Sequence, residues 1–330
     1  MKKKILVLGS NSFSGSHFVN LLLKKNFKII GISRSKEPIK CYLPYKYNKK
    51  LYNFKFYRKD LNKNLTEIIK IISKNKIKYI VNFASQGMVA ESWKNPKDWY
   101  LTNTLSQINF FQELKKIKIK KYLHISTPEI YGSSKKKIYE TNAHNPTTPY
   151  AISRSAADKH LFGLNKIFEF PVVFARAANV YGPGQQLYRI IPKIIISIKK
   201  NILIPIHGMG KSKRSFVHID DTSDGYFKIL MNGKIGQCYH ISAKNYLSIK
   251  KLAMLICAIL KKKHSNFLKF LPEDRPGKDM DYFLSSKKIK KELKWKDTID
   301  LYKGIKDTIE WINDNYKILS KEPMKYRHKQ

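Results

Sequence analysis

Short, continuously apolar runs alternate with amphipathic helical patterns along the first half of this 330-residue chain. Six runs predict strands, at residues 5–8, 27–32, 54–57, 79–84, 122–125 and 172–175, and the segments 65–73, 99–114 and 149–168 predict helices. Strands that are apolar on both faces are typical of parallel sheets covered by helices on each side. The alternation therefore predicts an α/β fold with a doubly wound parallel sheet.

A glycine-containing turn follows the first predicted strand. Gly9 and Gly15 hold the first and last positions of a dinucleotide-binding turn, in which glycines let the backbone approach a pyrophosphate, and Ser12 holds the middle position. At the end of the second strand, Arg34 stands between two serines where an acidic residue would bind the ribose of NAD. Because an arginine there accommodates a 2′-phosphate, the pattern predicts a Rossmann-like domain with NADP favoured over NAD. Asp60 is expected to contact the adenine.

The alternation of strand and helix patterns ends after residue 183. An apolar stretch over 190–206, interrupted by Pro192 and Pro205, is followed by helical patterns over 248–260 and 301–316. We therefore expect a Rossmann-like domain over residues 1–180, with segments near 214–245 returning to it, and a smaller C-terminal substrate-binding domain over 181–330. Residues 321–330 predict a frayed basic tail.

The net charge raises the question of a nucleic-acid partner, because 65 Lys and Arg face 24 Asp and Glu, a formal charge of +41. Eight of the basic residues are arginine and 57 are lysine, and the lysines are spread along the whole chain. A nucleic-acid-binding protein usually gathers its basic residues on one face or tail. We therefore expect no nucleic-acid partner, and we treat each of the few arginines as informative.

Three widely separated cysteines exclude a disulfide framework and a Cys-x-x-Cys metal site, and no histidine spacing supports a metal. The N-terminus lacks the long apolar region of a secretory signal, and no run approaches the roughly 18 apolar residues of a membrane span. The expectation is a cytoplasmic protein with no metal and no membrane partner.

Five segments together resemble a known family. They are residues 82–86, 126–132, 150–154, 179–183 and 275–279, and the first three follow predicted strands or open a helix, at the edge of a parallel sheet where ligands bind. In this order and spacing they resemble the extended short-chain dehydrogenase/reductase family, most closely its nucleotide-sugar 4,6-dehydratases. The resemblance covers about residues 3–295.

The resemblance implies a reaction in which a nicotinamide cofactor takes hydride from C4 of the sugar, water leaves across C5–C6, and hydride returns to C6. Tyr150 would remove the C4 hydroxyl proton, helped by Arg154, which stands where the family has lysine. Thr127 would hydrogen-bond the C4 oxygen, and Glu129 would remove the C5 proton. Many family members place an aspartic acid between these two as the acid for the departing C6 hydroxyl, whereas this chain has Pro128.

The resemblance also implies the ligand contacts. The expected cofactor residues are Gly9, Ser12, Phe13, Gly15, Arg34, Asp60, Leu61, Phe83, Ala84, Gln86, Tyr150 and Arg154. The expected nucleotide-diphosphate-sugar residues are Gln86, Asn179, Arg214 and Arg275. A homodimer paired through the helices at 99–114 and 149–168 is implied as well. Two alternatives stay open: a nucleotide-sugar 4-epimerase, in which Glu129 would be idle, and a catalytically silent cofactor-binding homologue.

Overall fold

A seven-stranded sheet forms the centre of the computed structural model, which describes residues 3–274 and 281–328. The strand order is β12-β7-β5-β4-β1-β2-β3, and every neighbouring pair is parallel. The strands are β1 (Lys4–Leu8), β2 (Lys28–Ser33), β3 (Phe54–Arg58), β4 (Tyr79–Asn82), β5 (Lys121–Ile125), β7 (Val172–Ala177) and β12 (Cys238–Ile241). This is a doubly wound α/β sheet, so the predicted fold class is confirmed.

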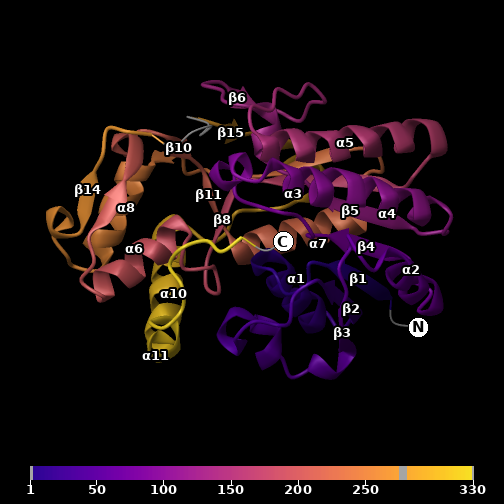
Figure 1. Ribbon diagram of the computed structural model, residues 1–330, viewed down its shortest axis with the longest axis horizontal. Helices are drawn as coiled ribbons and strands as arrows, with labels where there is room; N and C mark the ends of the chain where they lie inside the picture. The colour runs from indigo at the N-terminus through magenta and orange to yellow at the C-terminus, as the bar shows by residue number, and fades with distance from the viewer. Residues whose placement is uncertain (1–2, 275–280, 329–330) are drawn as a thin grey trace.

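Both faces of the sheet are buried, which is why its strands are continuously apolar. On β1, Ile5 and Val7 point into one core, and Leu6 and Leu8 point into the other. The first core packs α1 (Phe13–Lys24), α7 (Ile219–Asn232) and α9 (Lys287–Leu293). The second packs α2 (Leu65–Lys74), α4 (Ser106–Lys115) and α5 (Pro149–Phe168) on the opposite face (Figure 1).

The helix predicted over 99–114 is built from three successive pieces, α3 (Pro96–Tyr100), a π-helical turn (Leu101–Leu105) and α4. Within the turn, the buried Asn103 side chain accepts a hydrogen bond from the backbone nitrogen of Gln86 at 2.7 Å and donates to its carbonyl oxygen at 3.0 Å. A π-turn often marks a functional position in a helix. Here it anchors the loop that follows β4.

The later part of the chain builds a third core, away from the central sheet, on the left in Figure 1. It contains α6 (Ile190–Lys199), α8 (Ile249–Ile259), α10 (Leu301–Asp314) and α11 (Tyr316–Leu319). Within residues 3–274 and 281–328, four two-stranded sheets lie outside the central one. They pair β8 (Asn179–Tyr181) with β11 (Phe216–His218), β9 (Ile204–Ile206) with β14 (Leu268–Phe270), β10 (Lys213–Arg214) with β13 (Leu247–Ser248), and β6 (Lys137–Ile138) with β15 (Phe283–Leu284).

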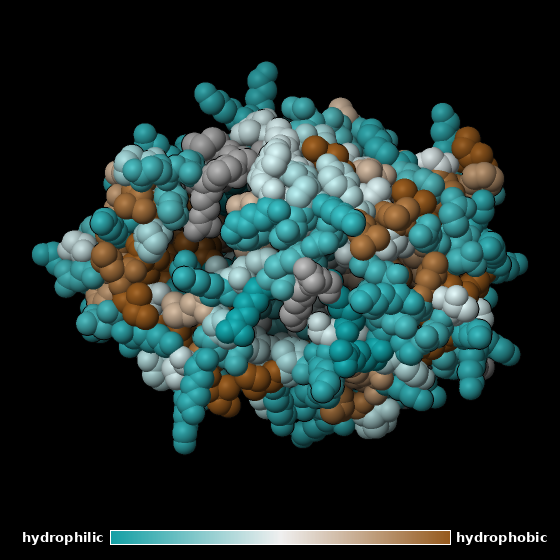
Figure 2. Space-filling view, viewed as in Figure 1, coloured by the Kyte–Doolittle hydropathy of each residue, from teal (hydrophilic) through white to brown (hydrophobic). Residues whose placement is uncertain are grey.

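The face of the molecule in Figure 2 is largely hydrophilic, and apolar side chains interrupt it on the left, where α6, α8 and β14 lie. Among the helices of the described residues, none has the length and apolar character that crossing a membrane requires.

The prediction of a frayed C-terminal tail is wrong for residues 321–328. After α11 the chain runs back to the middle of the molecule (Figure 1). There the Gln86 side-chain amide donates a hydrogen bond to the Tyr326 hydroxyl at 2.7 Å, and His328 stacks on Trp99 with ring centroids 5.0 Å apart. The aromatic rings within this basic segment supply the packing that a tail of lysines alone lacks.

Candidate active site

A cavity of about 990 Å³ opens beyond the carboxyl ends of β1, β4 and β5. Ligands of doubly wound sheets bind where the strand order reverses, here between β1 and β4. The cavity is lined by Gly9, Ser12, Phe13, Arg34, Asp60, Leu61, Phe83, Ala84, Gln86, Thr127, Glu129, Tyr150, Arg154, Asn179 and Arg214. Of the remaining predicted residues, Gly15 lies in the first turn of α1 and does not line the cavity, and Arg275 lies outside the described residues.

The turn after β1 packs closely against the end of β4 and the start of α1, because glycines stand at its two ends. Gly9 has φ +73°, and a Cβ there would lie 2.9 Å from the backbone nitrogen of Ala84. A Cβ on Gly15 would overlap the carbonyl oxygen of Gly9. Ser12 is the N-cap of α1, and its hydroxyl accepts a hydrogen bond from the Gly15 nitrogen at 3.1 Å. The serine in the middle position therefore orders the helix start that a dinucleotide pyrophosphate requires.

The Arg34 and Gln86 side chains are in contact beside the turn that follows β1. The Arg34 guanidinium donates to Gln86 Oε1 at 2.6 Å, although the two residues follow different strands, β2 and β4. Arg34 thus lies in the predicted cofactor cavity and faces inward. Its role toward a 2′-phosphate stays a prediction.

The start of α5 places the Tyr150 and Arg154 pair. The Thr148 hydroxyl caps the helix by accepting from the Ala151 nitrogen at 3.2 Å, and Pro149 holds the first helical position. Tyr150 and Arg154 then lie one helical turn apart on one face. The Arg154 side chain is buried, with 3% of its surface exposed, and its guanidinium donates a hydrogen bond to the carbonyl oxygen of Ile125. Its Nε has no hydrogen-bond partner among the described residues.

Burial raises the pKa of the Tyr150 phenol above its ordinary value, and the negative charge of Glu129 raises it further. The positive charge of Arg154 and a hydrogen bond with Thr127 lower this pKa without offsetting those effects. Tyr150 is therefore a neutral phenol in the protein alone. Its ionisation needs an additional positive charge nearby.

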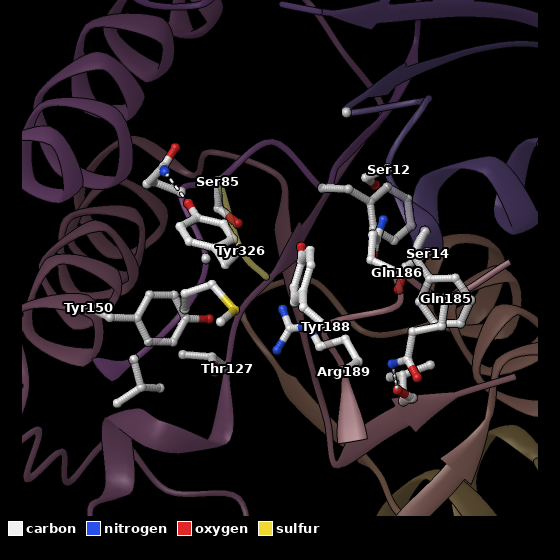
Figure 3. Close-up of a pocket in the computed structure, with 18 of the residues that line it drawn as sticks. Ser12, Ser14, Ser85, Thr127, Tyr150, Gln185, Gln186, Tyr188, Arg189 and Tyr326 are labelled. Carbon is white, nitrogen blue, oxygen red and sulfur yellow. Dashed lines mark hydrogen bonds between the residues drawn. The ribbon is translucent and has the colours of Figure 1, made fainter. Parts of the chain in front are cut away.

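A short 3₁₀ helix, Pro128–Tyr131, places the Glu129 carboxylate in the cavity. Pro128 stands at its first position, where the fixed φ of proline suits a helix start. The Thr127 hydroxyl donates to Glu129 Oε2, and the Tyr282 hydroxyl lies 3.4 Å from Glu129 Oε1. Figure 3 shows Thr127 beside the ring of Tyr150.

Behind Arg154 lies a buried charge cluster that the sequence analysis missed. Asp158, one turn further along α5, accepts hydrogen bonds from the Ser126 hydroxyl at 2.5 Å and the Arg176 guanidinium at 2.9 Å. His124 Nε2 lies 3.1 Å from its other oxygen. Asp158 and Arg176 are fully buried. The one available signal was Arg176 itself, a rare arginine within an otherwise apolar strand.

The far side of the cavity carries Asn179, Arg214 and three residues that the sequence analysis also missed, Tyr188, Arg189 and Tyr282. The Tyr282 hydroxyl donates to Asn179 Oδ1 at 2.8 Å, and the Arg214 guanidinium lies 4.3 Å from the centre of the Tyr282 ring. In Figure 3, Tyr188 and Arg189 project between the Tyr150 side and the Ser12 side of the cavity.

Arginine, rather than positive charge in general, is concentrated in this cavity. Arg34, Arg154, Arg189, Arg214 and Arg327 line it together with three lysines. Among the residues that the structure describes, five arginines and three lysines line the cavity, although the sequence holds 57 lysines and eight arginines. A guanidinium group binds two phosphate oxygens at once, so the lining suits diphosphate ligands.

The C-terminal segment forms one wall of the same cavity. Tyr326 lies beside Ser85 in Figure 3, and its ring packs edge-on against Tyr188 with centroids 5.5 Å apart. His328 Nε2 pairs with Asp98 Oδ2 at 2.6 Å. These contacts join the tail both to the loop after β4 and to the segment before α6.

The fold and the cavity together define a doubly wound enzyme that binds ligands at the switch point of its sheet. A sequence profile of the family described as GDP-mannose 4,6 dehydratase matches residues 6–308. A dTDP-D-glucose 4,6-dehydratase of Bos taurus is 30% identical, with 95% of this chain and 90% of that protein covered. The chain therefore belongs to the nucleotide-sugar 4,6-dehydratase family, as its motifs predicted.

Solved structures agree with this placement. The dTDP-glucose 4,6-dehydratase of Streptomyces venezuelae, determined with NAD bound, is 25% identical with a TM-score of 0.86 and covers 95% of this chain and 98% of that chain. A UDP-glucuronic acid 4-epimerase of Bacillus cereus, determined with UDP-glucuronic acid and NAD, is 26% identical with a TM-score of 0.86 and covers 95% and 100%. Dehydratases and epimerases share this fold, so the fold alone does not separate the two activities.

Proposed function

We propose that this protein converts a nucleotide-diphosphate hexose into the corresponding 4-keto-6-deoxy sugar nucleotide, with residues from about 181 onward supplying most of the sugar-nucleotide contacts. The observation that carries the proposal is the convergence of Thr127, Glu129, Tyr150 and Arg154 on the cavity beside the glycine turn. A 4-epimerase has no use for a base at C5. The Glu129 carboxylate is held by the Thr127 hydroxyl inside the cavity, which favours elimination.

A nicotinamide dinucleotide fits the residues present, because Gly9 and Gly15 let the turn after β1 pack closely before the N-terminus of α1, where a pyrophosphate binds, and the buried Arg154 Nε has a donor to offer. When bound, it accepts hydride from C4 and returns hydride to C6. Tyr150, once ionised beside the positive charges of Arg154 and the bound cofactor, takes the proton of the C4 hydroxyl, and Thr127 holds the C4 oxygen. Once C4 is a ketone, the C5 proton is acidic, and Glu129 removes it.

We further propose NADP rather than NAD as the cofactor. The segment after β2 carries Arg34 and no carboxylate to bind a ribose 2′-hydroxyl, and the Arg34 guanidinium already faces the cavity. Mass spectrometry of the nucleotide released by denaturing the purified protein distinguishes the two cofactors, and recovery of NAD alone would contradict the preference.

Incubation with GDP-, UDP- and thymidine-diphosphate hexoses, followed by mass spectrometry, tests the reaction. Loss of one water from a sugar nucleotide is the expected result. An unchanged mass with an altered sugar configuration would indicate epimerisation. Turnover of no sugar nucleotide by cofactor-loaded protein would indicate a silent homologue.

The Arg154→Lys variant is expected to keep at least the parent's activity. Lysine preserves the positive charge that lowers the pKa of Tyr150, and it is shorter and able to move a proton. The Arg154→Ala variant should lose about 10²-fold in kcat, because the charge is gone. Steady-state kinetics of both variants measure the effect. Complete loss in Arg154→Lys would show that this site depends on a guanidinium group.

Ending the chain after Ser320 is expected to speed cofactor release about tenfold. The truncation removes the Gln86–Tyr326 and Asp98–His328 contacts, and losing about 1.4 kcal/mol of interaction corresponds to a factor of ten. Exchange of bound cofactor against excess labelled cofactor gives the rate. A chain ending after His328 is the matched control, and equal rates for the two would exclude the tail from cofactor retention.

We also propose a homodimer paired through α3, α4 and α5. Apolar side chains are exposed on α3, on the π-helical turn that joins it to α4, and on α5, at Tyr100, Leu101, Leu105 and Ile152. Light scattering after size exclusion measures the molar mass. The Leu105→Lys variant should lower it, whereas the control Ile318→Lys, on α11, should not.

A further inference from the structure

Two hydroxyl groups flank the carboxylate of Glu129. Thr127 holds one oxygen, and the Tyr282 hydroxyl lies 3.4 Å from the other. Tyr282 is 2% exposed and lines the cavity. We propose that Tyr282 is the acid that protonates the departing C6 hydroxyl group. This inference rests on the proposed dehydratase function.

The elimination needs an acid, because hydroxide is a poor leaving group. Pro128 has no proton to give, and Glu129 is engaged in removing the C5 proton. A phenol, with an ordinary pKa near 10, is a far stronger acid than the aliphatic hydroxyl of Thr127. Tyr150 is committed to the C4 hydroxyl. Tyr282 is therefore the group beside Glu129 that is suited to the step.

The surroundings of Tyr282 keep its proton in place before the reaction. Its hydroxyl donates to the amide oxygen of Asn179 at 2.8 Å, and an amide oxygen accepts a hydrogen bond without taking the proton. The Arg214 guanidinium lies 4.3 Å from the ring centre. Its positive charge favours the phenolate that remains once the proton has left.

The proton balance closes between Glu129 and Tyr282. As the C5–H bond breaks, Glu129 takes the proton, the electron pair forms the C5–C6 double bond, and the C6–O bond breaks. The Tyr282 proton joins the leaving oxygen to give water. The phenolate then recovers a proton from the carboxyl group of Glu129 across the 3.4 Å separation, so both side chains return to their starting states. When hydride adds to C6, C5 takes a proton from solvent, and Tyr150 releases to solvent the proton that it took from the C4 hydroxyl. The step consumes no oxidant or reductant.

The Tyr282→Phe variant tests the proposal, because it keeps the ring that packs under Arg214 and removes only the hydroxyl. TDP-glucose and GDP-mannose are the probes, each compared with its 6-deoxy-6-fluoro analogue, since fluoride leaves without an acid. We expect water loss to slow by about 10²- to 10⁴-fold, while fluoride is eliminated at the parent's rate. The exposed Tyr302→Phe is the matched control, and thermal unfolding checks that both variants fold.

The comparison between leaving groups separates the outcomes. Equal slowing with both leaving groups would mean that Tyr282 only positions Glu129, and unchanged water loss would mean that it is dispensable; either result overturns the acid role. If the parent protein dehydrates neither probe nor any sugar of the wider panel, the proposed function itself fails, and the acid role falls with it before any variant is compared.

Discussion

Replacing Glu129 with glutamine is expected to stop dehydration while leaving oxidation at C4 in place. Glutamine keeps the size of the side chain and an oxygen that can accept from the Thr127 hydroxyl, but it cannot take a proton from C5. A positioned general base contributes about 10²- to 10⁴-fold, so we expect the rate of water loss to fall about 10³-fold. The reduced cofactor should accumulate, because hydride has no acceptor at C6, and its absorbance provides the measurement.

The matched control for this change is Glu91→Gln. Glu91 pairs with Lys94 at 3.0 Å and does not line the cavity, so its loss of charge should leave both half-reactions unchanged. Full dehydratase activity in Glu129→Gln would remove Glu129 from the base role. Loss of C4 oxidation as well would show that the carboxylate also acts on Tyr150, whose pKa its charge raises.

Removing the carboxylate of Asp158 is expected to be the most damaging single change to stability. The Asp158→Ala variant leaves the Arg176 guanidinium buried without its 2.9 Å partner. Breaking a buried ion pair from one side costs about 3–5 kcal/mol in the free energy of unfolding. Denaturant unfolding near pH 7 measures the loss, and a loss under about 1 kcal/mol would contradict the expectation.

The pH dependence gives this prediction a second measurement. Burial by itself raises the pKa of Asp158, but the hydrogen bond from His124 and the charge of Arg176 outweigh it, so the pKa lies below its ordinary value. A carboxyl group whose pKa is lower in the folded than in the unfolded protein stabilises the fold. This stabilisation is complete above the pKa of the unfolded chain, about 3.9 for aspartate, and it is lost as the pH falls toward the pKa of the folded protein. The difference between parent and variant should therefore shrink only below about pH 4.

Two controls separate the buried pair from charge removal in general. Asp307→Ala breaks the surface pair with Lys303, 3.1 Å long, and should cost less than about 1 kcal/mol. The double variant Asp158→Leu with Arg176→Met removes both charges and should recover part of the loss. A double variant no more stable than Asp158→Ala would show that the remaining polar contacts of the cluster dominate.

Much of the site follows from the sequence because it depends on local patterns. Glycine spacing after β1, a capped helix start before Tyr150 and the polar residues after β5 are each readable within about ten residues. Once the alternation of apolar runs and helices indicates a parallel sheet, the geometry of the sheet determines where the residues after each strand lie. The carboxyl ends of its strands meet at one edge, so residues that follow different strands converge there.

The partners of those residues depend on contacts between distant segments. Tyr282 lies 153 positions from Glu129, and Tyr326 lies 240 positions from Gln86, so no periodicity or spacing links them. The C-terminal segment shows where prediction from the sequence fails. Its composition indicates a solvated segment, whereas Tyr326 and His328 pack against Tyr188 and Trp99, which only the folded molecule brings near them.

The sequence by itself determined the doubly wound fold, the family and those cavity residues that directly follow strands or open helices, because hydrophobic periodicity and turn chemistry are local properties of the chain. Only the tertiary structure decided that burial and Glu129 raise the pKa of Tyr150, that Asp158 and Arg176 form a buried pair behind it, and that Tyr282 and the C-terminal segment complete the cavity. The pKa values of these side chains, their burial and the walls of the cavity depend on which surfaces are excluded from water. Packing between elements that are distant in the sequence determines those surfaces.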